Sequence, residues 1–304
     1  MTVIVSGTFE IRVAGAQTGS STINVGDGPN GVAYNPSNNN IYVSNEEDNS
    51  VSVIDSDNNI NDTIFVGDGP NGVAYNPSNN NIYVTNRFNG SVSVIDSNND
   101  VIDTIVVGSS PQGVAYNPSN NSTYVTNNFD NSVSIIDSDN IVNNTIAVGE
   151  GPVGIAFNPN NNSTYTANMG DNTVSVIDSS NTLTDTIDVG EGPLGIAFNP
   201  NNNNIYVTNS DDNSVSVLDS NNMVINTLAV GNSPHGIAFR SSTNSIYVTN
   251  TDDNSISVID SNDLIEETLV IDRVNPEGLA YNPSNNNMYI ANSGDNTVSI
   301  LSKG

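Results

Sequence analysis

The sequence predicts an all-β fold, a seven-bladed β-propeller of four-stranded antiparallel blades. One pattern, Pro-x-Gly-[Val/Ile/Leu]-Ala-[Tyr/Phe], recurs along most of the 304 residues. Its prolines are spaced by 41 residues five times and by 42 residues once. Repeats of this length that are rich in short β-prone runs are typical of propellers, which close on themselves. The seven prolines are Pro29, Pro70, Pro111, Pro152, Pro193, Pro234 and Pro276.

The second repeat shows how each blade is expected to form. Residues 72–76 alternate small and large side chains, which suits a strand beside the crowded propeller axis, and Pro77 ends that strand. Residues 82–85 and 92–95 are β-branched, aromatic or small, and they predict the second and third strands. Residues 104–107 predict the outer strand. A blade buried on both faces explains why apolar residues alternate with serine rather than with charge.

The two ends of the chain predict how the ring closes. The last repeat contains only three strands, and the missing outer strand matches residues 21–25. We expect residues 21–25 to complete the blade formed by residues 276–302, because this removes an open sheet edge. Residues 21–304 then form one propeller domain, and residues 1–20 form an N-terminal extension with extra strands. Those strands either add to the closing blade or are donated to another molecule.

Charge and composition exclude several classes of function. Five Lys and Arg stand against 33 Asp and Glu, so the formal net charge is −28. No nucleic-acid partner is expected, because phosphate binding needs clustered cations. No segment has the ~20 apolar residues that span a bilayer, so no membrane insertion is expected, and no signal peptide is visible. The chain has no Cys and one His, which excludes a thiol nucleophile and a metal site with two histidines.

A second motif, Tyr-Val-Thr-Asn, lies on the predicted second strand of the blades. It stands at 83–86, 124–127, 206–209 and 247–250, with variants at 42–45, 165–168 and 289–292. Followed by Val-Ser-Val-Ile-Asp, it resembles the YVTN family of β-propeller repeats over residues 21–302. The family is similar to propellers of archaeal surface-layer proteins and of other secreted or envelope proteins. The resemblance implies that the Tyr fills the blade and the Asn caps the turn, and it supplies no catalytic residues.

Positions that differ between repeats are the candidates for function, since the rest of the pattern is constant. One set lies between the Pro and the Gly, where the inner strand begins at the mouth of the channel. Amide, apolar, imidazole and carboxylate side chains there suit either a small ligand or a solvent-filled mouth. These channel-mouth candidates are Asn30, Asn71, Gln112, Val153, Leu194, His235 and Glu277.

The loop after Tyr-x-x-Asn is the second variable set. On three adjacent blades it carries Arg87 with Phe88, Phe129 and Met169, which predict a patch that binds a partner protein. On other blades it is acidic. Carboxylate and amide oxygens are ligands for Ca²⁺, although no complete calcium-loop motif occurs. The calcium candidates are Asp211, Asp212, Asp252 and Asp253.

Near-identical blades with short loops favour a non-catalytic protein. We expect an extracellular or cell-surface propeller that mediates protein–protein contact or self-assembly, as in a surface layer, and that needs no cofactor apart from a possible Ca²⁺. The partner would be another protein, or a second copy held through residues 1–20. The enzymatic alternative is a propeller of lactonase or lyase type with its site at the channel mouth, in which His235 and Glu277 are the residues to test.

Overall fold

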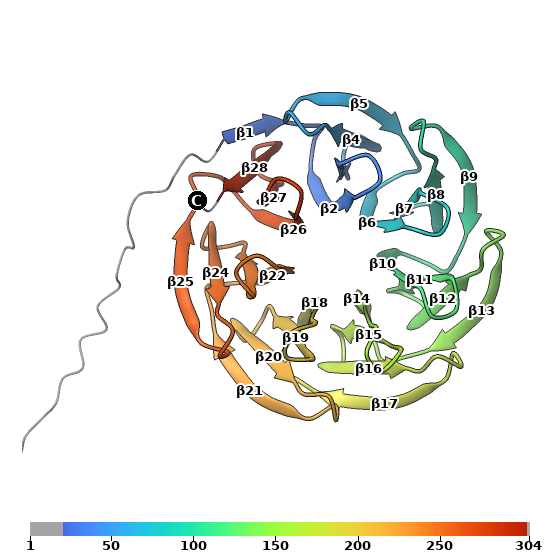
Figure 1. The fold of residues 1–304 in the computed structure, drawn as a ribbon. Coiled ribbons are helices and arrows are strands. Elements are labelled where there is room, and N and C mark those ends of the chain that lie inside the picture. The colour runs from blue at the N-terminus through green and yellow to red at the C-terminus, as the bar shows by residue number, and fades with distance from the viewer. Residues whose placement is uncertain (1–20, 303–304) are drawn as a thin grey trace, which may run out of the picture.

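The computed structural model describes residues 21–302, which form a ring of seven four-stranded antiparallel sheets around a central channel (Figure 1). In six blades the strands lie in sequence from the channel to the rim, and in the seventh the outer strand comes from the start of the described residues. The predicted seven-bladed propeller is confirmed. Residues 1–20, and with them the expected extra or donated strand, lie outside the described residues. Within the described range no helix is long and apolar enough to cross a membrane.

The inner strand of each blade begins at the proline of the repeat and lies beside the channel. Gly31 shows why the pattern requires glycine, because a Cβ there would lie 2.2 Å from the carbonyl oxygen of Asn71 on the next inner strand. The strands converge too closely at this point for any side chain. The inner strands are β2 (Pro29–Asn35), β6 (Pro70–Asn76), β10 (Pro111–Asn117), β14 (Pro152–Asn158), β18 (Pro193–Asn199), β22 (Pro234–Arg240) and β26 (Pro276–Asn282).

The second and third strands are buried almost throughout, because each blade packs between two others. The second strands are β3 (Asn40–Asn45), β7 (Asn81–Asn86), β11 (Ser122–Asn127), β15 (Ser163–Asn168), β19 (Asn204–Asn209), β23 (Ser245–Asn250) and β27 (Asn287–Asn292). The third strands are β4 (Ser50–Ile54), β8 (Ser91–Ile95), β12 (Ser132–Ile136), β16 (Thr173–Ile177), β20 (Ser214–Leu218), β24 (Ser255–Ile259) and β28 (Thr297–Ser302).

The outer strands form the rim and start earlier than predicted. In the second blade the strand begins at Val101 rather than at Thr104, because a bulge between Val94 and Ile95 lets Val101 pair with Ile95. The outer strands are β5 (Ile60–Phe65), β9 (Val101–Val106), β13 (Val142–Ala147), β17 (Leu183–Asp188), β21 (Val224–Ala229), β25 (Ile265–Val270) and, on the last blade, β1 (Ser21–Asn24).

The ring is closed as the sequence predicts. β1 lies antiparallel to β28, with Ser21 opposite Ile300 and Asn24 opposite Thr297. Figure 1 shows the N-terminal strand completing the blade built by the C-terminal strands. This pairing leaves one irregularity, because the seventh blade has no turn between its third and outer strands.

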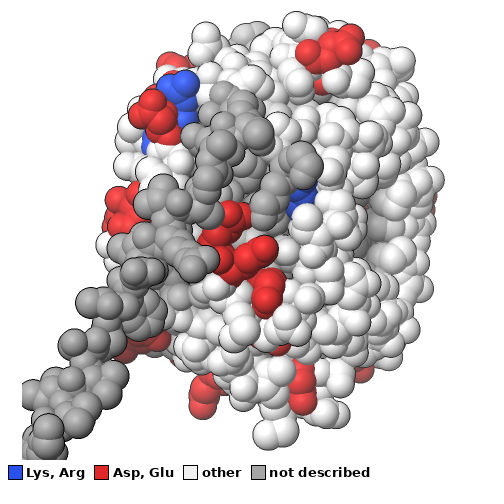
Figure 2. Space-filling view, turned by 60° about the vertical axis from the view of Figure 1, so that its left-hand side comes forward, with Lys and Arg blue, Asp and Glu red and all other residues white. Residues whose placement is uncertain are grey.

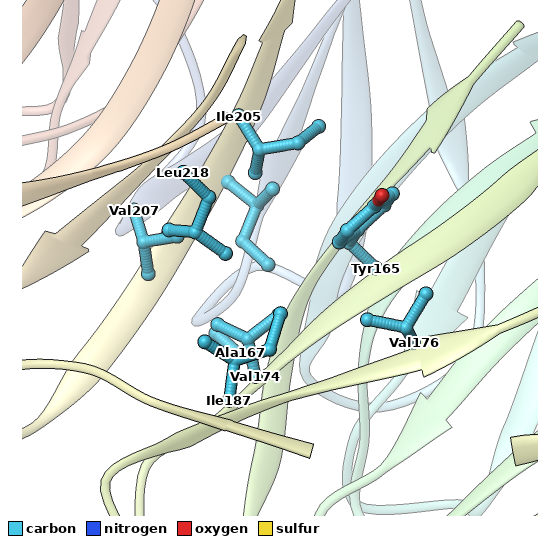
Figure 3. Packing of buried hydrophobic residues seen from close by; sticks show 9 residues of the cluster. Tyr165, Ala167, Val174, Val176, Ile187, Ile205, Val207 and Leu218 are labelled. Carbon is cyan, nitrogen blue, oxygen red and sulfur yellow. The ribbon is translucent and has the colours of Figure 1, made fainter. Parts of the chain in front are cut away.

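The core is a series of apolar layers between neighbouring blades. Figure 3 shows one layer, in which Tyr165, Val174 and Val176 of the fourth blade face Val207 and Leu218 of the fifth. All of these side chains are almost wholly buried. Because every blade belongs to two such layers, the ring holds each inner strand in a fixed position.

Six of the seven motif tyrosines also link their blade to the next blade. The Tyr42 hydroxyl donates to Oδ1 of Asn99, at 2.9 Å, in the turn before the outer strand of the second blade. Five more tyrosines bond equivalent turn residues: Tyr83 to Asn140, Tyr124 to Asn181, Tyr165 to Asn222, Tyr206 to Asp263, and Tyr289 to Asn58.

Tyr247 is the exception, because the seventh blade lacks that turn. Arg240 stands where the other repeats have Asn, and it is fully buried. Its Nη1 donates to the Tyr247 hydroxyl at 3.4 Å and its Nη2 donates to the carbonyl of Asn286 at 2.8 Å. Its guanidinium also lies 5.6 Å from the Tyr247 ring centre and 5.7 Å from that of Tyr281. Arg240 therefore substitutes for the missing turn at the seam of the ring.

Candidate functional site

The seven channel-mouth candidates line one cavity of about 410 Å³ at one end of the channel. They are joined there by residues that directly follow the Tyr-x-x-Asn motif, including Glu46, Arg87 and Met169. The loop that precedes each inner strand and the loop that follows each second strand lie at the same end of the ring. The backbone hydrogen bond from Glu46 N to Gly28 O, which joins one loop of each kind, shows this. The structure thus brings all seven predicted positions together.

A β-bulge positions each of these seven side chains. In the sixth blade Pro234 pairs with Asn250 and Ile237 pairs with Val248, so one extra residue lies between these pairs on the inner strand. His235 occupies that bulge, and Glu277 occupies the equivalent bulge of the seventh blade. Bulges redirect side chains and are frequent beside active sites. The Pro-x-Gly pattern therefore turns the variable residue toward the channel.

His235 and Glu277 form one of two close pairs of ionisable side chains in this cavity. Nδ1 of His235 lies 3.2 Å from Oε2 of Glu277, the separation of an ion pair, although the N–H direction is not aligned for a hydrogen bond. The other carboxylate oxygen, Oε1, accepts from Oγ of Ser293 at 3.2 Å. The His235 side chain is 32% exposed, so the ring remains accessible from the channel while Nδ1 is buried.

Hydroxyl groups hold the backbone of both residues. Oγ1 of Thr208 donates to the carbonyl of His235 at 2.8 Å, and Oγ1 of Thr249 donates to the carbonyl of Glu277 at 2.7 Å. Each bond crosses from one blade to the next. The same position is Ala167 in the fourth blade, so the carbonyl of Leu194 receives no such bond. The two residues of the pair are therefore held more firmly than Leu194.

A second ion pair lies on the first and second blades. Nη1 of Arg87 is 3.2 Å from Oε1 of Glu46, and its guanidinium lies 5.6 Å from the ring centre of Phe88. A larger cavity of about 1020 Å³ adjoins here and shares Asn30, Glu46 and Glu277 with the channel mouth. Acidic side chains are also spread over the side of the ring shown in Figure 2, where basic ones are few.

The arc of the mouth on the third to fifth blades carries the apolar side chains together with Gln112, Asn128 and Ser210. Val153 and Leu194 line the cavity on the fourth and fifth blades, with Met169 above the same arc. Gln112 ends the arc on the third blade and is only 8% exposed. The cavity therefore combines a polar pair, an apolar wall and an amide, which is a typical composition for a small-molecule site.

The residues of the predicted partner patch line two cavities that share Arg87. Phe88 and Phe129 are 68% and 73% exposed, and they line one cavity of about 420 Å³ together with Arg87. Met169 is 42% exposed and lines the channel mouth, as Arg87 also does. Partner binding at these four residues stays a prediction.

The calcium candidates bond loop groups of the protein. Oδ2 of Asp212 accepts from the backbone N of Glu191, and Oδ2 of Asp253 accepts from the backbone N of Asn232. Asp252 accepts from Oγ of Ser233, and Asp211 packs against Gly192. No group of three or more His, Cys, Asp or Glu side chains within residues 21–302 is arranged to hold a metal ion. Binding of Ca²⁺ stays a prediction.

Sequence reasoning missed Ser293 and Glu46 as members of the site. Both directly follow the Asn of the second-strand motif, at the first position where the repeats diverge. The inner and second strands pair so that this Asn lies opposite the proline of the repeat. The residue after the Asn could therefore have been placed beside the channel-mouth residues by comparing the seven repeats.

Comparison with known proteins agrees with this architecture. Residues 8–144 match a family model described as lactonase, 7-bladed beta-propeller. That match covers less than half of the chain and ends in the third blade, so His235 and Glu277 lie outside it. No curated protein matches the sequence.

Solved propellers superpose on nearly the whole chain at low sequence identity. A streptogramin B lyase has a TM-score of 0.82 at 13% identity, over 94% of this chain and 99% of the lyase. A catalytically inactive histidine-to-alanine variant of virginiamycin B lyase from Staphylococcus aureus, with quinupristin, has a TM-score of 0.83 at 17% identity, with the same coverage. Hydrazine synthase of Kuenenia stuttgartiensis has a TM-score of 0.78 at 17% identity, over 96% of this chain and 99% of that chain.

These findings correct two predictions. The expectation of a non-catalytic scaffold for surface assembly, and the prediction that the chain is not an enzyme, are contradicted by the lactonase model and the two lyases. The reasoning failed because it treated near-identical blades as leaving no room for a site. In a closed ring, single residues on adjacent blades meet at the channel, as His235 and Glu277 do.

Proposed function

We propose that this propeller is an enzyme that opens a cyclic ester by general-base catalysis at the channel mouth. The observation that carries the proposal is the 3.2 Å contact between His235 Nδ1 and Glu277 Oε2 inside a cavity. An imidazole whose Nδ1 faces a carboxylate is oriented to accept a proton at Nε2. Imperfect alignment without substrate does not argue against this role, because catalytic hydrogen bonds often tighten only when substrate binds.

The pair can perform hydrolysis in two balanced steps. His235 Nε2 takes a proton from water while the water oxygen bonds to the ester carbonyl carbon. The bond from that carbon to the ring oxygen then breaks, and the imidazolium returns the proton to the departing alkoxide. Glu277 stabilises the positive charge on the imidazolium between these steps, and Ser293 holds the carboxylate in place.

A lyase reaction is the second candidate. In this reaction the same base would remove a proton from carbon, and the ester oxygen would leave as a carboxylate without any water being added. The inactive histidine variant of the S. aureus lyase favours it, since His235 is the one histidine of this chain. The two reactions are separated by their products, because only hydrolysis incorporates oxygen from labelled water and only elimination leaves a new double bond.

The test is turnover of a panel of lactones and cyclic depsipeptides by the wild type and two variants. His235→Ala and Glu277→Gln should each reduce kcat/KM by about 100-fold or more, the typical contribution of a general base. Asn262→Ala, on an exposed outer turn of the sixth blade, is the matched control and should retain full activity. Wild-type turnover that survives both substitutions would refute the proposal. Membership in the YVTN repeat family and an extracellular location remain predictions beside it.

A further inference from the structure

Gln112 is an almost fully buried residue whose side-chain amide opens onto the channel mouth. The residue is 92% buried, since only 8% of its surface is exposed, and it lines the channel-mouth cavity. Its backbone carbonyl accepts from Oγ1 of Thr85 at 2.7 Å, so the main chain is fixed. Its side-chain amide, by contrast, forms no hydrogen bond to any residue between 21 and 302. Buried polar side chains are nearly always paired, and an amide that faces a cavity is available to a ligand.

The position of Gln112 relative to the reactive pair defines how a ligand would lie. Around the mouth, the third blade carries Gln112, the fourth and fifth carry Val153 and Leu194, and the sixth and seventh carry His235 and Glu277. On this side of the mouth, Val153 and Leu194 lie between Gln112 and the pair. A molecule that reacts at His235 and reaches Gln112 along this side passes two apolar side chains, which suit an aliphatic segment.

The chemistry of the amide selects the group that pairs with it. A glutamine side chain offers one carbonyl acceptor and an NH₂ donor side by side, which matches the N–H and C=O of another amide. A carboxylate would accept from the same NH₂ but has no N–H to donate to the glutamine carbonyl, whereas an amide pairs with both groups. A neutral amide therefore fits this end of the site best.

We propose that Gln112 is a specificity-determining residue that binds an amide group of the substrate, separated by an aliphatic segment from the reacting ester. The inference rests on the proposed function for the position of the ester, but it concerns recognition rather than reaction. Sites built to pair a polar group discriminate strongly against analogues that lack it, because their own buried polar atoms are then left unpaired.

The experiment compares two probes that differ in one group. The first is a lactone whose alkyl side chain ends in an N-methylamide, and the second is the matching methyl ester, in which oxygen replaces N–H. Binding of each is measured by titration calorimetry with the wild type, Gln112→Leu and Gln112→Glu. Asn262→Leu makes the same kind of change on an exposed outer turn of the sixth blade, outside the cavity. Turnover is recorded separately with the same proteins.

The amide probe should bind the wild type about tenfold more tightly than the ester, a difference of one good hydrogen bond. Gln112→Leu should abolish this preference and Gln112→Glu should weaken it, whereas Asn262→Leu should preserve it. Equal binding of the two probes, binding of neither, or a preference that survives Gln112→Leu would overturn the inference.

The turnover record separates this inference from the proposed function. Preferential binding of the amide without ring opening would support the role of Gln112 and count against the lactone-opening activity. Equal binding with ring opening by wild type but not by His235→Ala would support the activity and refute the amide site.

Discussion

Oγ1 of Thr249 donates a 2.7 Å hydrogen bond to the carbonyl oxygen of Glu277, across the boundary between the sixth and seventh blades. This bond joins a fully buried side chain to the bulge that presents the candidate carboxylate. Thr208 does the same for His235. The reactive geometry is thus held from the neighbouring blade rather than from within the blade that carries each residue.

Removing these hydroxyls should reduce activity more than it reduces stability. We expect Thr249→Ala and Thr208→Ala to lower kcat several-fold with little change in KM, because each loosens one partner of the pair. Ser44→Ala is the matched control, since Oγ of Ser44 makes the equivalent bond to Asn71 O at 2.5 Å. All three should cost a similar ~1 kcal/mol of unfolding free energy, measured by denaturant titration. Equal kcat losses in all three would contradict the positioning role.

Ser293 is predicted to position Glu277 through its side chain. Its Oγ donates to Oε1 of Glu277 at 3.2 Å and lies 3.3 Å from the carbonyl oxygen of Asn275. Ser293→Ala should lower kcat several-fold with little change in KM, because the carboxylate then loses the donor that holds it beside His235. Ser293→Thr retains the hydroxyl and should restore most of the activity. If the threonine variant behaves like the alanine variant, the hydroxyl has no such role.

Arg240 is predicted to be the most important single side chain for closing the ring. Arg240→Ala should cost about 3 kcal/mol, because it leaves a cavity and removes the donors to Tyr247 and Asn286. Arg240→Asn inserts the residue of the other blades and should recover only part of this loss, since the seventh blade still lacks the turn that would bond Tyr247. Urea denaturation of both variants and of wild type measures the difference. Wild-type stability of Arg240→Asn would show that the seam needs no special residue.

Alkaline pH should weaken the link between the fifth and sixth blades. Burial, and the hydrogen bond to the Asp263 carboxylate, raise the pKa of Tyr206 from 10.0 to about 12. A group whose pKa is higher in the folded state stabilises the fold fully below its unfolded pKa and loses this contribution as pH rises through its folded pKa. The stabilisation should therefore decline between pH 10 and about 12.

Near-ultraviolet absorbance of tyrosinate, followed with unfolding free energy over this range, measures the effect. In Tyr206→Phe the decline should be smaller, although not absent, because burial also raises the pKa of Tyr42, Tyr83, Tyr124 and Tyr165. An identical decline in the variant would show that Tyr206 ionises without affecting the fold.

Much of the fold can be predicted from the sequence, because the same local solution is repeated seven times. The proline, the glycine and the motif tyrosine each have the same role in every repeat. The closing strand at residues 21–24 can also be recognised, because it matches the outer strand of the other repeats although it precedes the first of them. The outer strand was placed three residues late because its first residues, Val101 and Ile102, pair through a bulge that leaves no mark in composition.

The site was predictable as a ring of positions but not as a set of contacts. The seven variable residues after the prolines do meet in one cavity. The repeat spacing did not reveal that His235 and Glu277 approach to 3.2 Å, because that distance depends on rotamers chosen within the bulge. It also did not reveal that Gln112 is almost fully buried while its neighbour Asn71 is not, since both occupy the same place in the repeat.

The hydroxyl bonds from six of the motif tyrosines to the following blade bear on how the protein unfolds. In an open array, repeats interact only with their neighbours and can fray one by one from the ends. Here six of the seven blades are tied to the next by a bond between the second strand and the neighbour's outer turn. Loss of one blade therefore exposes two apolar faces and breaks one or two of these bonds. Unfolding should be a single cooperative transition, and it should begin at the joint between the sixth and seventh blades, where Tyr247 bonds its own blade instead of the next.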